Sequence, residues 1–413
     1  MRTVLDSILT RLIRYGCLAV SWPDGTRRVY AGAPGPAAEL RVEHPDWVRR
    51  LALDPAMVFG EAYMEGALQP VGCDIYDVLD VLLLNTSQGA SHPVVRLHQR
   101  LRDLGQWLGR LTGRGPERHE VAYHYDLDSR LYSLFLDEDQ QYSCAYFRRG
   151  DESLEEAQRE KKRHIAAKLL LNRPGLTVLD IGCGWGGLAL TLAQDFGARV
   201  TGITLSTEQL NLARARAEAA GLSDLVRFEL ADYRSIDARY DRIVSVGMLE
   251  HVGNANYGAF FGMVQRCLEP DGVALIHHIG RAAGPGSTSP WLRKYIFPGG
   301  YSPALSDVLP DIERSGLMTT DIEVLRLHYA RTLRLWRERF ALHRDTIRDL
   351  YDERFCRMFE FYLAGAELTF RHERHVVFQV QLSPSQTSLP FTRDYMMAEP
   401  GPNPRIIQTA QAL

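Results

Sequence analysis

The residues that point most directly to chemistry form a glycine-rich loop, GCGWGG at positions 182–187, which follows an apolar run ending near Asp180. Glycines let a loop approach a ligand closely because no Cβ intervenes. Dinucleotide-binding loops use the spacing GxGxxG, and an acidic residue after the next strand binds the ribose. Here the spacing is GxGxGG, and the next strand-like run ends in GITLS without an acidic residue. An acidic residue beside this loop suits the charged amino-acid end of S-adenosylmethionine (SAM). A tight turn that binds no ligand is the alternative.

Polar residues also follow or end three later strand-like runs. Asp232 could accept a hydrogen bond from an adenine amino group, with Tyr233 beside the ring, although a simple turn residue is the alternative. Glu250 follows the next run, and His277 and His278 lie in the run after that. Because side chains alternate along a strand, only one of these two histidines can face the same site as Glu250. Ligands of doubly wound sheets collect at the carboxyl ends of the strands, so these residues are candidates for the site.

The elements that must position these residues begin at about position 121, where apolar, β-branched runs alternate with helical stretches. Strands are expected before the glycine loop and at 198–206, 225–233, 240–248 and 272–280. This alternation predicts an α/β domain with a parallel, doubly wound sheet. Two amphipathic helices, 332–350 and 355–370, and a last strand, 375–383, are expected to follow.

The first 120 residues have a different character. Short alternating segments and helices over 1–90 predict a small α+β domain, with Pro23-Asp24-Gly25 as a hairpin turn. Residues 91–118 carry leucines at helical spacing and six arginines against two acidic residues. This pattern predicts a basic amphipathic helix that either rests on anionic lipid or packs as an ordinary linker. The expected domains are 1–90, a helical linker at 91–120, a catalytic domain at 121–395 and a tail at 396–413.

Composition excludes several classes of protein. The 413 residues carry a net charge of −3, so no global positive field indicates nucleic acid as a partner. Six cysteines occur singly, without a CxxC pair, which argues against a disulfide framework or a metal site and fits a reducing compartment. No apolar run reaches the ~18 residues of a membrane span, and the first residues lack the apolar core of a signal peptide. We expect a cytoplasmic protein that associates peripherally with the inner face of the membrane.

Six segments, in this order, resemble the cyclopropane-fatty-acyl-phospholipid synthase family, which includes the mycolic acid cyclopropane synthases. They are YHYDLDSRLYSLFLDEDQQYSCAYF, VLDIGCGWGGLA, YDRIVSVGMLEHVGNANY, LIHHIG, PWLRKYIFPGGYSP and HYARTLRLWRERF. The resemblance covers roughly 120–383 strongly and 59–68 weakly. It implies a Rossmann-like, class I SAM-dependent methyltransferase domain. It also implies transfer of a methylene unit from SAM to the cis double bond of unsaturated acyl chains in membrane phospholipids, forming cyclopropanes.

The resemblance also implies the residues of the site and a second bound group, bicarbonate. The catalytic set around bicarbonate is Cys144, Glu250, His277, Ile279 and Tyr329. Together with the residues singled out above, the cofactor-binding set is Tyr142, Ser143, Asp180, Gly182, Gly184, Gly186, Thr204, Leu205, Gln209, Asp232 and Tyr233.

The implied reaction makes chemical sense of these residues. An alkene is itself the nucleophile, so no base is needed until the resulting carbocation must lose a proton, and bicarbonate is then the general base. Tyr146, Phe147 and Tyr301 are offered by residue type as aromatic groups that steady the cation. Three departures from the family pattern, at 128–129, at Gln140 and at His278, leave the product open between a cyclopropane and a methyl-branched or methylene-bearing chain.

The expected function also implies partners for the protein, and the same residues argue against two alternative functions. A phospholipid substrate implies contact with the membrane surface, a tunnel for the acyl chain walled by the helices at 332–350 and 355–370, and, by resemblance, a homodimer through the N-terminal domain. An NAD-dependent oxidoreductase is disfavoured by the missing acidic residue after the second strand. A non-catalytic lipid carrier would leave Cys144, Glu250 and His277 unexplained.

Overall fold

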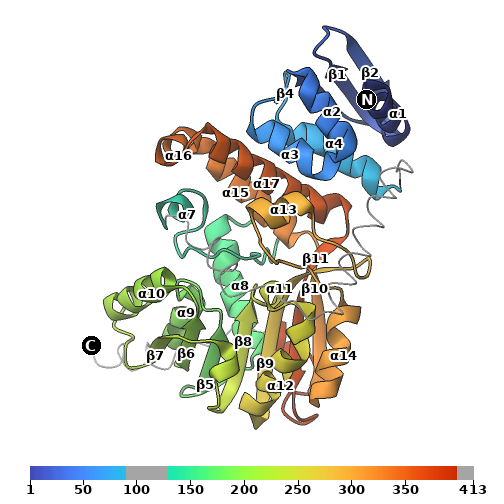
Figure 1. Cartoon of the computed structure of the whole chain (residues 1–413). Coiled ribbons are helices and arrows are strands. Elements are labelled where there is room, and N and C mark those ends of the chain that lie inside the picture. Colours follow the sequence, from blue (N-terminus) through green and yellow to red (C-terminus); the bar gives the residue numbers. More distant parts are fainter. Residues whose placement is uncertain (90–128, 398–413) are drawn as a thin grey trace. The chain divides into compact units, whose positions relative to one another are not determined.

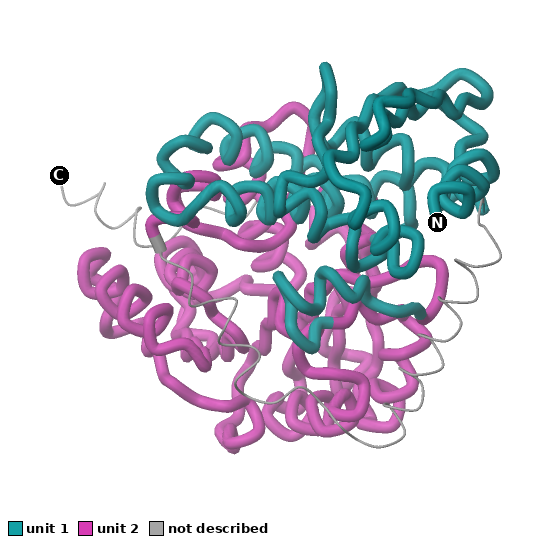
Figure 2. The backbone as a smooth tube through the Cα atoms, turned by 45° about the horizontal axis from the view of Figure 1, so that its top comes forward, with its two compact units in different colours: residues 1–114, 286–300, 329–375 teal, residues 115–285, 301–328, 376–413 magenta. Residues whose placement is uncertain are grey.

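The computed structural model describes residues 1–89 and 129–397 (Figure 1). The predicted basic helix at 91–118 and nearly all of the predicted tail lie outside these residues. The chain forms two compact units, drawn in different colours in Figure 2. Unit 1 comprises residues 1–114, 286–300 and 329–375, and unit 2 comprises residues 115–285, 301–328 and 376–413. Unit 1 thus includes two segments from the second half of the chain, whereas the domain boundaries expected at 90 and 120 stay a prediction.

Unit 2 contains a seven-stranded sheet in the order β10-β11-β9-β8-β5-β6-β7. The strands are β5 (Thr177–Ile181), β6 (Arg199–Thr204), β7 (Val226–Leu230), β8 (Tyr240–Val246), β9 (Leu268–Arg281), β10 (Met318–Leu325) and β11 (His375–Ser383). Strands β5 to β9 pair in parallel, which confirms the expected α/β fold. The sheet is not parallel throughout, however, because β10 and β11 pair antiparallel at one end. Strand β10 was not expected from the sequence.

Helices cover both faces of this sheet (Figure 1). They are α7 (Ser129–Phe135), α8 (Leu154–Lys168), α9 (Gly187–Phe196), α10 (Thr207–Ala219), α11 (Leu249–Val252), α12 (Tyr257–Cys267), α14 (Leu305–Ser315) and α18 (Asp394–Met397). Alternate residues of β5 enter different cores: Val178 packs with residues of α8, α9 and α10, whereas Leu179 packs with residues of α12 and α14. Both faces are therefore buried, which is why the strands are apolar along their whole length.

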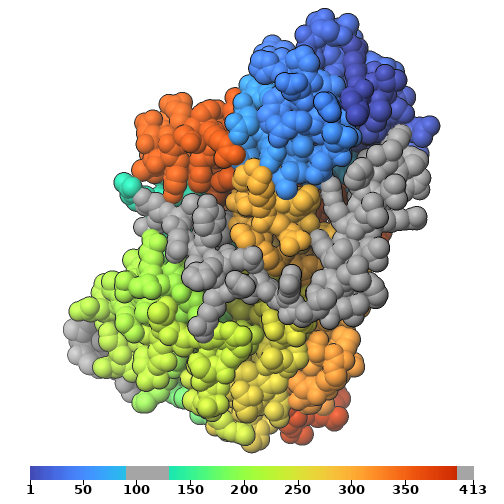
Figure 3. Space-filling view, viewed as in Figure 1, coloured from blue at the N-terminus to red at the C-terminus, as the bar shows by residue number. Residues whose placement is uncertain are grey.

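Unit 1 begins with a four-stranded sheet in the order β2-β1-β3-β4, and residues 1–89 form one packed body (Figure 3, blue). Its strands are β1 (Tyr15–Ser21), β2 (Arg27–Ala31), β3 (Ala33–Val42) and β4 (Leu68–Pro70). Its helices are α1 (Arg2–Leu12), α2 (Pro45–Leu53), α3 (Pro55–Met64), α4 (Ile75–Ser87), α13 (Pro290–Tyr295), α15 (His328–Leu342), α16 (Arg344–Leu350) and α17 (Glu353–His372). Strands β1 and β2 form the expected hairpin, closed by a hydrogen bond from Gly25 N to Trp22 O.

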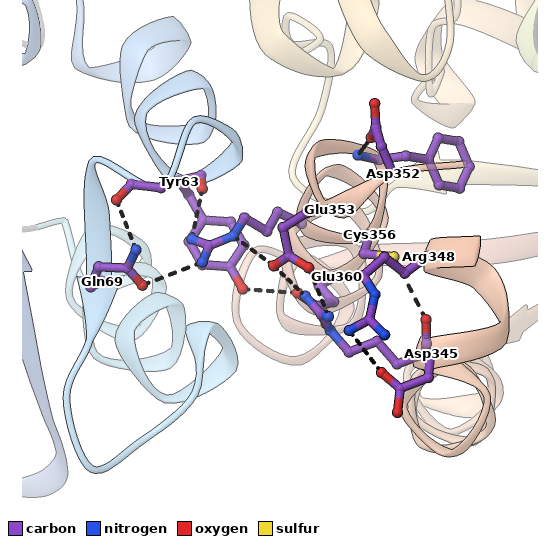
Figure 4. Close-up of polar contacts among 12 residues, drawn as sticks. Tyr63, Gln69, Asp345, Arg348, Asp352, Glu353, Cys356 and Glu360 are labelled. Carbon is purple, nitrogen blue, oxygen red and sulfur yellow. Dashed lines mark hydrogen bonds and ion pairs between the residues drawn. The ribbon is translucent and has the colours of Figure 1, made fainter. Parts of the chain in front are cut away.

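The helix expected over 332–350 is in fact two helices, α15 and α16, which separate at His343. The expected helix at 355–370 is confirmed as α17. Polar contacts join these helices to α3 within unit 1 (Figure 4). Arg344 donates to both Glu353 and Glu360, and Tyr63 on α3 donates its hydroxyl proton to Glu360. No helix of the two described ranges has the length and hydropathy to cross a bilayer.

Candidate active site

The glycine loop connects β5 to α9, and its glycines serve different purposes. Gly182, Gly184 and Gly186 have φ values of 80°, 54° and 84°, a region that side chains disfavour. A Cβ on Gly186 would lie 2.6 Å from the Phe228 ring, so close packing also explains this glycine. A Cβ on Gly184 would meet nothing within 4 Å. The backbone of the loop is therefore open at Gly184, where a ligand can approach it.

Asp180 lies on β5 just before this loop, with only 2% of its surface exposed. Its Oδ2 atom has no hydrogen-bond partner, and burial raises the pKa of the carboxyl group to about 7. A buried polar atom without a partner is unfavourable unless a ligand supplies one. A cationic donor, such as the ammonium of an amino acid, would satisfy Oδ2 and favour the ionised form.

The segment 137–144, which carries Tyr142 and Ser143, lies against the glycine loop. The Asp137 carboxylate accepts hydrogen bonds from the backbone nitrogens of Asp139 and Gln141 at 3.1 and 2.8 Å, which shapes the segment as a turn. A Cβ on Gly187 would overlap the Asp139 carboxylate, so this glycine permits the close approach. Arg216 also ties the two parts together, because it donates to Trp185 O at 2.9 Å and pairs with Asp139.

Tyr142 is fixed by an aromatic cluster at the same place. Its ring meets the Tyr132 ring edge-on at 5.3 Å, and Tyr132 in turn packs against Trp185 of the glycine loop at 4.9 Å. These contacts bring Tyr142 to the loop whose sequence indicated a ligand.

Helix α8 supplies three polar side chains to this segment, those of Gln158, Lys161 and Lys162. A capping box between Ser153 and Glu156 starts the helix and so sets the direction of its buried face. Lys161 Nζ donates to Gln141 Oε1 at 2.6 Å and to Ser143 Oγ at 2.8 Å. Gln158 Nε2 donates to the Ser143 carbonyl at 3.0 Å. Sequence reasoning missed Lys161.

The spacing of the sequence contained a signal for Lys161. Ala157, Lys161 and Ile165 recur every four residues, which places them on one helix face, and all three are buried in the structure. A lysine at such a position must find polar partners inside the protein.

The remaining predicted cofactor residues lie at the end of β6 or in the segments that follow β6 and β7. Thr204 and Gln209 are buried and joined, because Thr204 Oγ1 donates to Gln209 Oε1 at 2.8 Å, and Leu205 between them is exposed. Asp232 accepts from the Arg234 backbone at 2.9 Å and from its guanidinium, which is the turn role weighed as the alternative. The Tyr233 ring meets Phe260 edge-on at 5.4 Å. Contact of Asp232 and Tyr233 with adenine stays a prediction.

Glu250 lies in α11, after β8, and is buried. Its Oε1 atom accepts a hydrogen bond from the Ile279 backbone nitrogen at 2.6 Å, which joins two predicted catalytic residues directly. Its Oε2 atom has no partner, and burial raises the pKa of the carboxyl group to about 7. Oε2 is therefore available to a hydrogen-bonding ligand.

His277 is buried on β9, two residues before Ile279 and hence on the same face of the strand. Its Nδ1 atom lies 3.1 Å from Gln379 Nε2 on β11. Burial, reinforced by the positive charge of Lys161, holds the pKa of His277 well below its usual value, so the ring is neutral. His278 packs instead near Phe378, at 5.6 Å, so the two histidines face opposite sides as expected. Sequence reasoning missed Gln379, although a glutamine among the valines and the phenylalanine of a strand was a signal.

The other predicted residues divide between the two units. Cys144 is 1% exposed in unit 2, where its thiol contacts the Ala145 carbonyl oxygen. Tyr329 belongs to unit 1, where its ring packs against Trp336 and Phe370. The structure therefore places Cys144, Glu250, His277 and Ile279 in one unit, and a position of Tyr329 beside them stays a prediction.

The suggested role of Tyr146 in steadying a cation is not supported. Its ring stacks on His164 at 4.2 Å and on His328 at 5.1 Å. These imidazoles occupy the aromatic surface that a cation would need.

The sheet order, the open glycine loop after the interior strand β5 and the unpaired acid beside that loop define a class I SAM-dependent methyltransferase. A family model described as mycolic acid cyclopropane synthetase matches residues 113–380. The chain belongs to this family.

Individual relatives agree. The chain is 38% identical over 346 residues to the cyclopropane-fatty-acyl-phospholipid synthase of Escherichia coli, covering 84% of this chain and 88% of that protein. It is 37% identical over 380 residues to a probable fatty acid methyltransferase of Pseudomonas putida, covering 88% and 92%. The solved structure of mycolic acid cyclopropane synthase CmaA1 with SAH and CTAB matches with a TM-score of 0.62 at 34% identity, covering 65% of this chain and 99% of that one.

The residues present fit both expected groups. Oδ2 of Asp180 would hold the ammonium of SAM, beside the open backbone at Gly184. Oε2 of Glu250 would hold bicarbonate, since this ion offers both a donor and an acceptor, and a carboxyl group with a pKa of about 7 can match either.

Proposed function

We propose that this enzyme transfers a methylene unit from SAM to the cis double bond of unsaturated acyl chains in membrane phospholipids and closes a cyclopropane ring. The observation that carries the proposal is the buried, unpaired Oε2 of Glu250, on a carboxyl group held by Ile279 in the same unit as Cys144 and His277. The 38% identity to the E. coli cyclopropane-fatty-acyl-phospholipid synthase over most of both chains supports the choice of substrate and product.

The first step of the proposed reaction, methyl transfer to the alkene, needs no base from the protein, whereas the second step, ring closure, needs one. SAM would supply an electrophilic methyl group, and the alkene provides the electron pair of the new carbon–carbon bond while the bond from sulfur to this methyl group breaks and S-adenosylhomocysteine leaves. The chain is left as a carbocation, and closure of the ring requires that a proton leave the added methyl group. Bicarbonate supplies a base for this proton.

The role of the protein is to bind this base and to exclude water from it. Glu250, with Ile279 fixing one of its oxygens, offers the second oxygen to the bound ion. Neutral His277 offers one ring nitrogen, because the other faces Gln379. Glu250, His277 and Gln379 are buried, which supports the exclusion of water that would otherwise capture the cation.

A methyl-branched or methylene-bearing product is the second candidate. The chain is 36% identical over 396 residues to the tuberculostearic acid methyltransferase UfaA1 of Mycobacterium tuberculosis. For a methylene-bearing product, a hydride shift moves the positive charge to the carbon that carries the new methyl group, and loss of a proton from that methyl group then forms the double bond. A saturated methyl-branched chain additionally needs a hydride from an external donor.

Expression in a bacterial host that lacks such enzymes separates these candidates. We expect membrane phospholipids whose acyl chains gain CH2 and show cyclopropane ring protons by NMR. A methylene-bearing chain has the same mass but shows vinylidene protons, and a saturated branched chain is two hydrogens heavier. Either of the last two results would replace ring closure with the second candidate, and unmodified lipids would contradict both.

We propose further that the enzyme works at the cytoplasmic face of the membrane, and as a homodimer through its N-terminal residues. An acyl double bond lies deep in the bilayer, so the chain must be drawn from the membrane into the protein. The arginines of 91–118 supply positive charge for anionic lipid headgroups. Sedimentation with lipid vesicles tests the first statement, and analytical ultracentrifugation tests the second.

A further inference from the structure

Lys161 on α8 is a buried cation with an unusual set of partners. It is 1% exposed, and its ammonium donates to two neutral oxygens, Gln141 Oε1 and Ser143 Oγ. Within the described residues, no carboxylate oxygen lies within the 4.0 Å of an ion pair from its Nζ. The negative charges of Asp137 and Asp139 favour the charged form of Lys161 from a longer distance, but no carboxylate of the described residues bonds its ammonium directly. The environment of Lys161 therefore favours a ligand that brings an anion.

The bond from Lys161 also decides what the Ser143 hydroxyl can do. A hydroxyl group has one proton to donate and can accept as well. Because Ser143 Oγ accepts from Lys161, its own proton remains for another acceptor. The Ser143 hydroxyl is therefore a hydrogen-bond donor, and the positive charge of Lys161 lies directly beside it.

Asp180 presents the opposite character nearby. The charge of Lys161 lowers the pKa of Asp180 against the effect of burial, so the two side chains interact electrostatically. Asp180 Oδ2 is an acceptor without a partner. A donor with positive charge and an acceptor with negative charge together match the two ends of an α-amino acid, its carboxylate and its ammonium.

We propose that Lys161 is a positioning residue for the methyl donor, which turns the Ser143 hydroxyl toward the carboxylate of SAM and supplies the positive charge facing that carboxylate. Burial lowers the pKa of Lys161 to about 8, so the side chain stays charged at neutral pH. The inference rests on SAM as the methyl donor and is independent of the lipid, of bicarbonate and of ring closure.

Comparing the affinities for two ligands distinguishes a positioning role of Lys161 from a purely structural role. S-adenosylhomocysteine (SAH) carries the amino-acid end, whereas 5′-methylthioadenosine keeps the nucleoside and the sulfur but lacks that end. Calorimetry of full-length Lys161→Met, which keeps the length of the side chain without its charge, should show SAH binding weakened at least tenfold. Binding of 5′-methylthioadenosine should stay within twofold of the unmodified enzyme.

Lys162 provides a matched control. It lies on the same helix and tethers the same segment, through Asp139 at 2.6 Å, but does not bond Ser143. Lys162→Met should change the affinities for both ligands by the same factor. Lys161→Met overturns the proposal if it weakens both ligands equally, which indicates a structural tether, or if it weakens neither.

Ser143→Ala tests the same inference if Lys161→Met does not fold. This variant keeps the lysine and removes the hydroxyl through which it acts, so SAH should lose affinity selectively over 5′-methylthioadenosine. Where both variants fold, their effects on SAH should be clearly less than additive, because they interrupt one interaction. Full additivity, or an equal loss of both ligands in Ser143→Ala, would contradict the proposal.

Discussion

At the scale of single residues, the proposed function depends on two buried carboxyl groups. Asp180 and Glu250 each keep one oxygen without a partner, and burial raises the pKa of each to about 7. Burying a carboxyl group without a partner for each oxygen lowers the stability of the fold. Groups whose pKa values are shifted in this way gather at functional sites, so a role in function accounts for them better than a role in folding.

Glu250→Gln separates catalysis from cofactor binding. The variant keeps the shape of the side chain and an acceptor for the Ile279 nitrogen, but it loses the carboxylate that would hold bicarbonate. Methyl transfer from labelled SAM to lipid should fall by about 10²–10⁴-fold, the usual range for loss of acid–base assistance. SAH affinity, measured by calorimetry, should stay within twofold. Equal losses of both would show that Glu250 is structural.

The same carboxyl group makes stability depend on pH. Its pKa is raised on folding, from an ordinary 4.5 to about 7, so the folded state favours the protonated form. This contribution is fully present below about pH 4.5 and is lost as the pH rises toward and through 7. A shift of this size corresponds to about 3 kcal/mol.

Urea unfolding at pH 5 and pH 8 measures the effect. The unmodified enzyme should lose more stability between these values than Glu250→Gln, which has no charge to bury there. Parallel losses in the two proteins would show that Glu250 does not ionise inside the folded protein. SAH is omitted, because its binding would change the ionisation of Asp180.

At the scale of elements, the weakly matching N-terminal motif at 59–68 is explained by packing within unit 1. Helix α3 crosses α13 closely, and a Cβ on Gly60 would lie 2.5 Å from the Trp291 indole nitrogen. One residue later, Glu61 accepts from Lys294 at 2.8 Å and from the Tyr295 hydroxyl at 2.9 Å. The motif therefore holds together α3 and α13, which are far apart in the sequence.

Gly60→Ala should destabilise unit 1 by about 1–3 kcal/mol, because an extra methyl group has no room beside the rigid indole. Thermal unfolding followed by circular dichroism measures the change. Gly365→Ala is the matched control: it lies in α17 of the same unit, and its Cβ would meet only Leu79, at 4.0 Å. This substitution should be neutral or slightly stabilising, since alanine favours a helix over glycine. Similar midpoints for the two variants would show that α3 and α13 are not tightly packed.

At the scale of the whole molecule, the proposed function requires the enzyme to reach a substrate that is dissolved in a membrane. The charge of the chain as a whole is −3, so attraction to an anionic surface has to come from a local excess of positive residues. The six arginines of 91–118 are such an excess, although this segment lies outside the described residues.

Replacing Arg96, Arg100, Arg102 and Arg110 by serine should weaken binding to phosphatidylglycerol vesicles by at least tenfold, since each basic residue near such a surface contributes about 1 kcal/mol. Co-sedimentation measures it, and phosphatidylcholine vesicles serve as the control. The difference should shrink as salt is raised. SAH affinity should not change. Unaltered binding to anionic vesicles would favour the ordinary linker over a lipid contact.

Much of the molecule followed from the sequence because its signals are local. The alternation of apolar runs with helices determined the parallel strands β5 to β9. The GCGWGG loop after Asp180 predicted the place of the methyl-donor site, and this stays a prediction. The ordered motifs determined the family. Each of these depends on residues within one or two elements, where backbone preferences and burial decide the structure.

Only the tertiary structure decided the rest, because it depends on residues distant in the sequence. In the sequence, Lys161 and Gln379 are only polar residues of a helix and a strand. The structure shows that Lys161 of α8 bonds Ser143 and that Gln379 of β11 lies beside His277. The sequence offers Asp232 as a ligand candidate, and only the structure shows that Arg234 pairs with its carboxylate, while contact with adenine stays a prediction. Long-range packing set these partners, and no local pattern records which polar groups will meet inside a folded core.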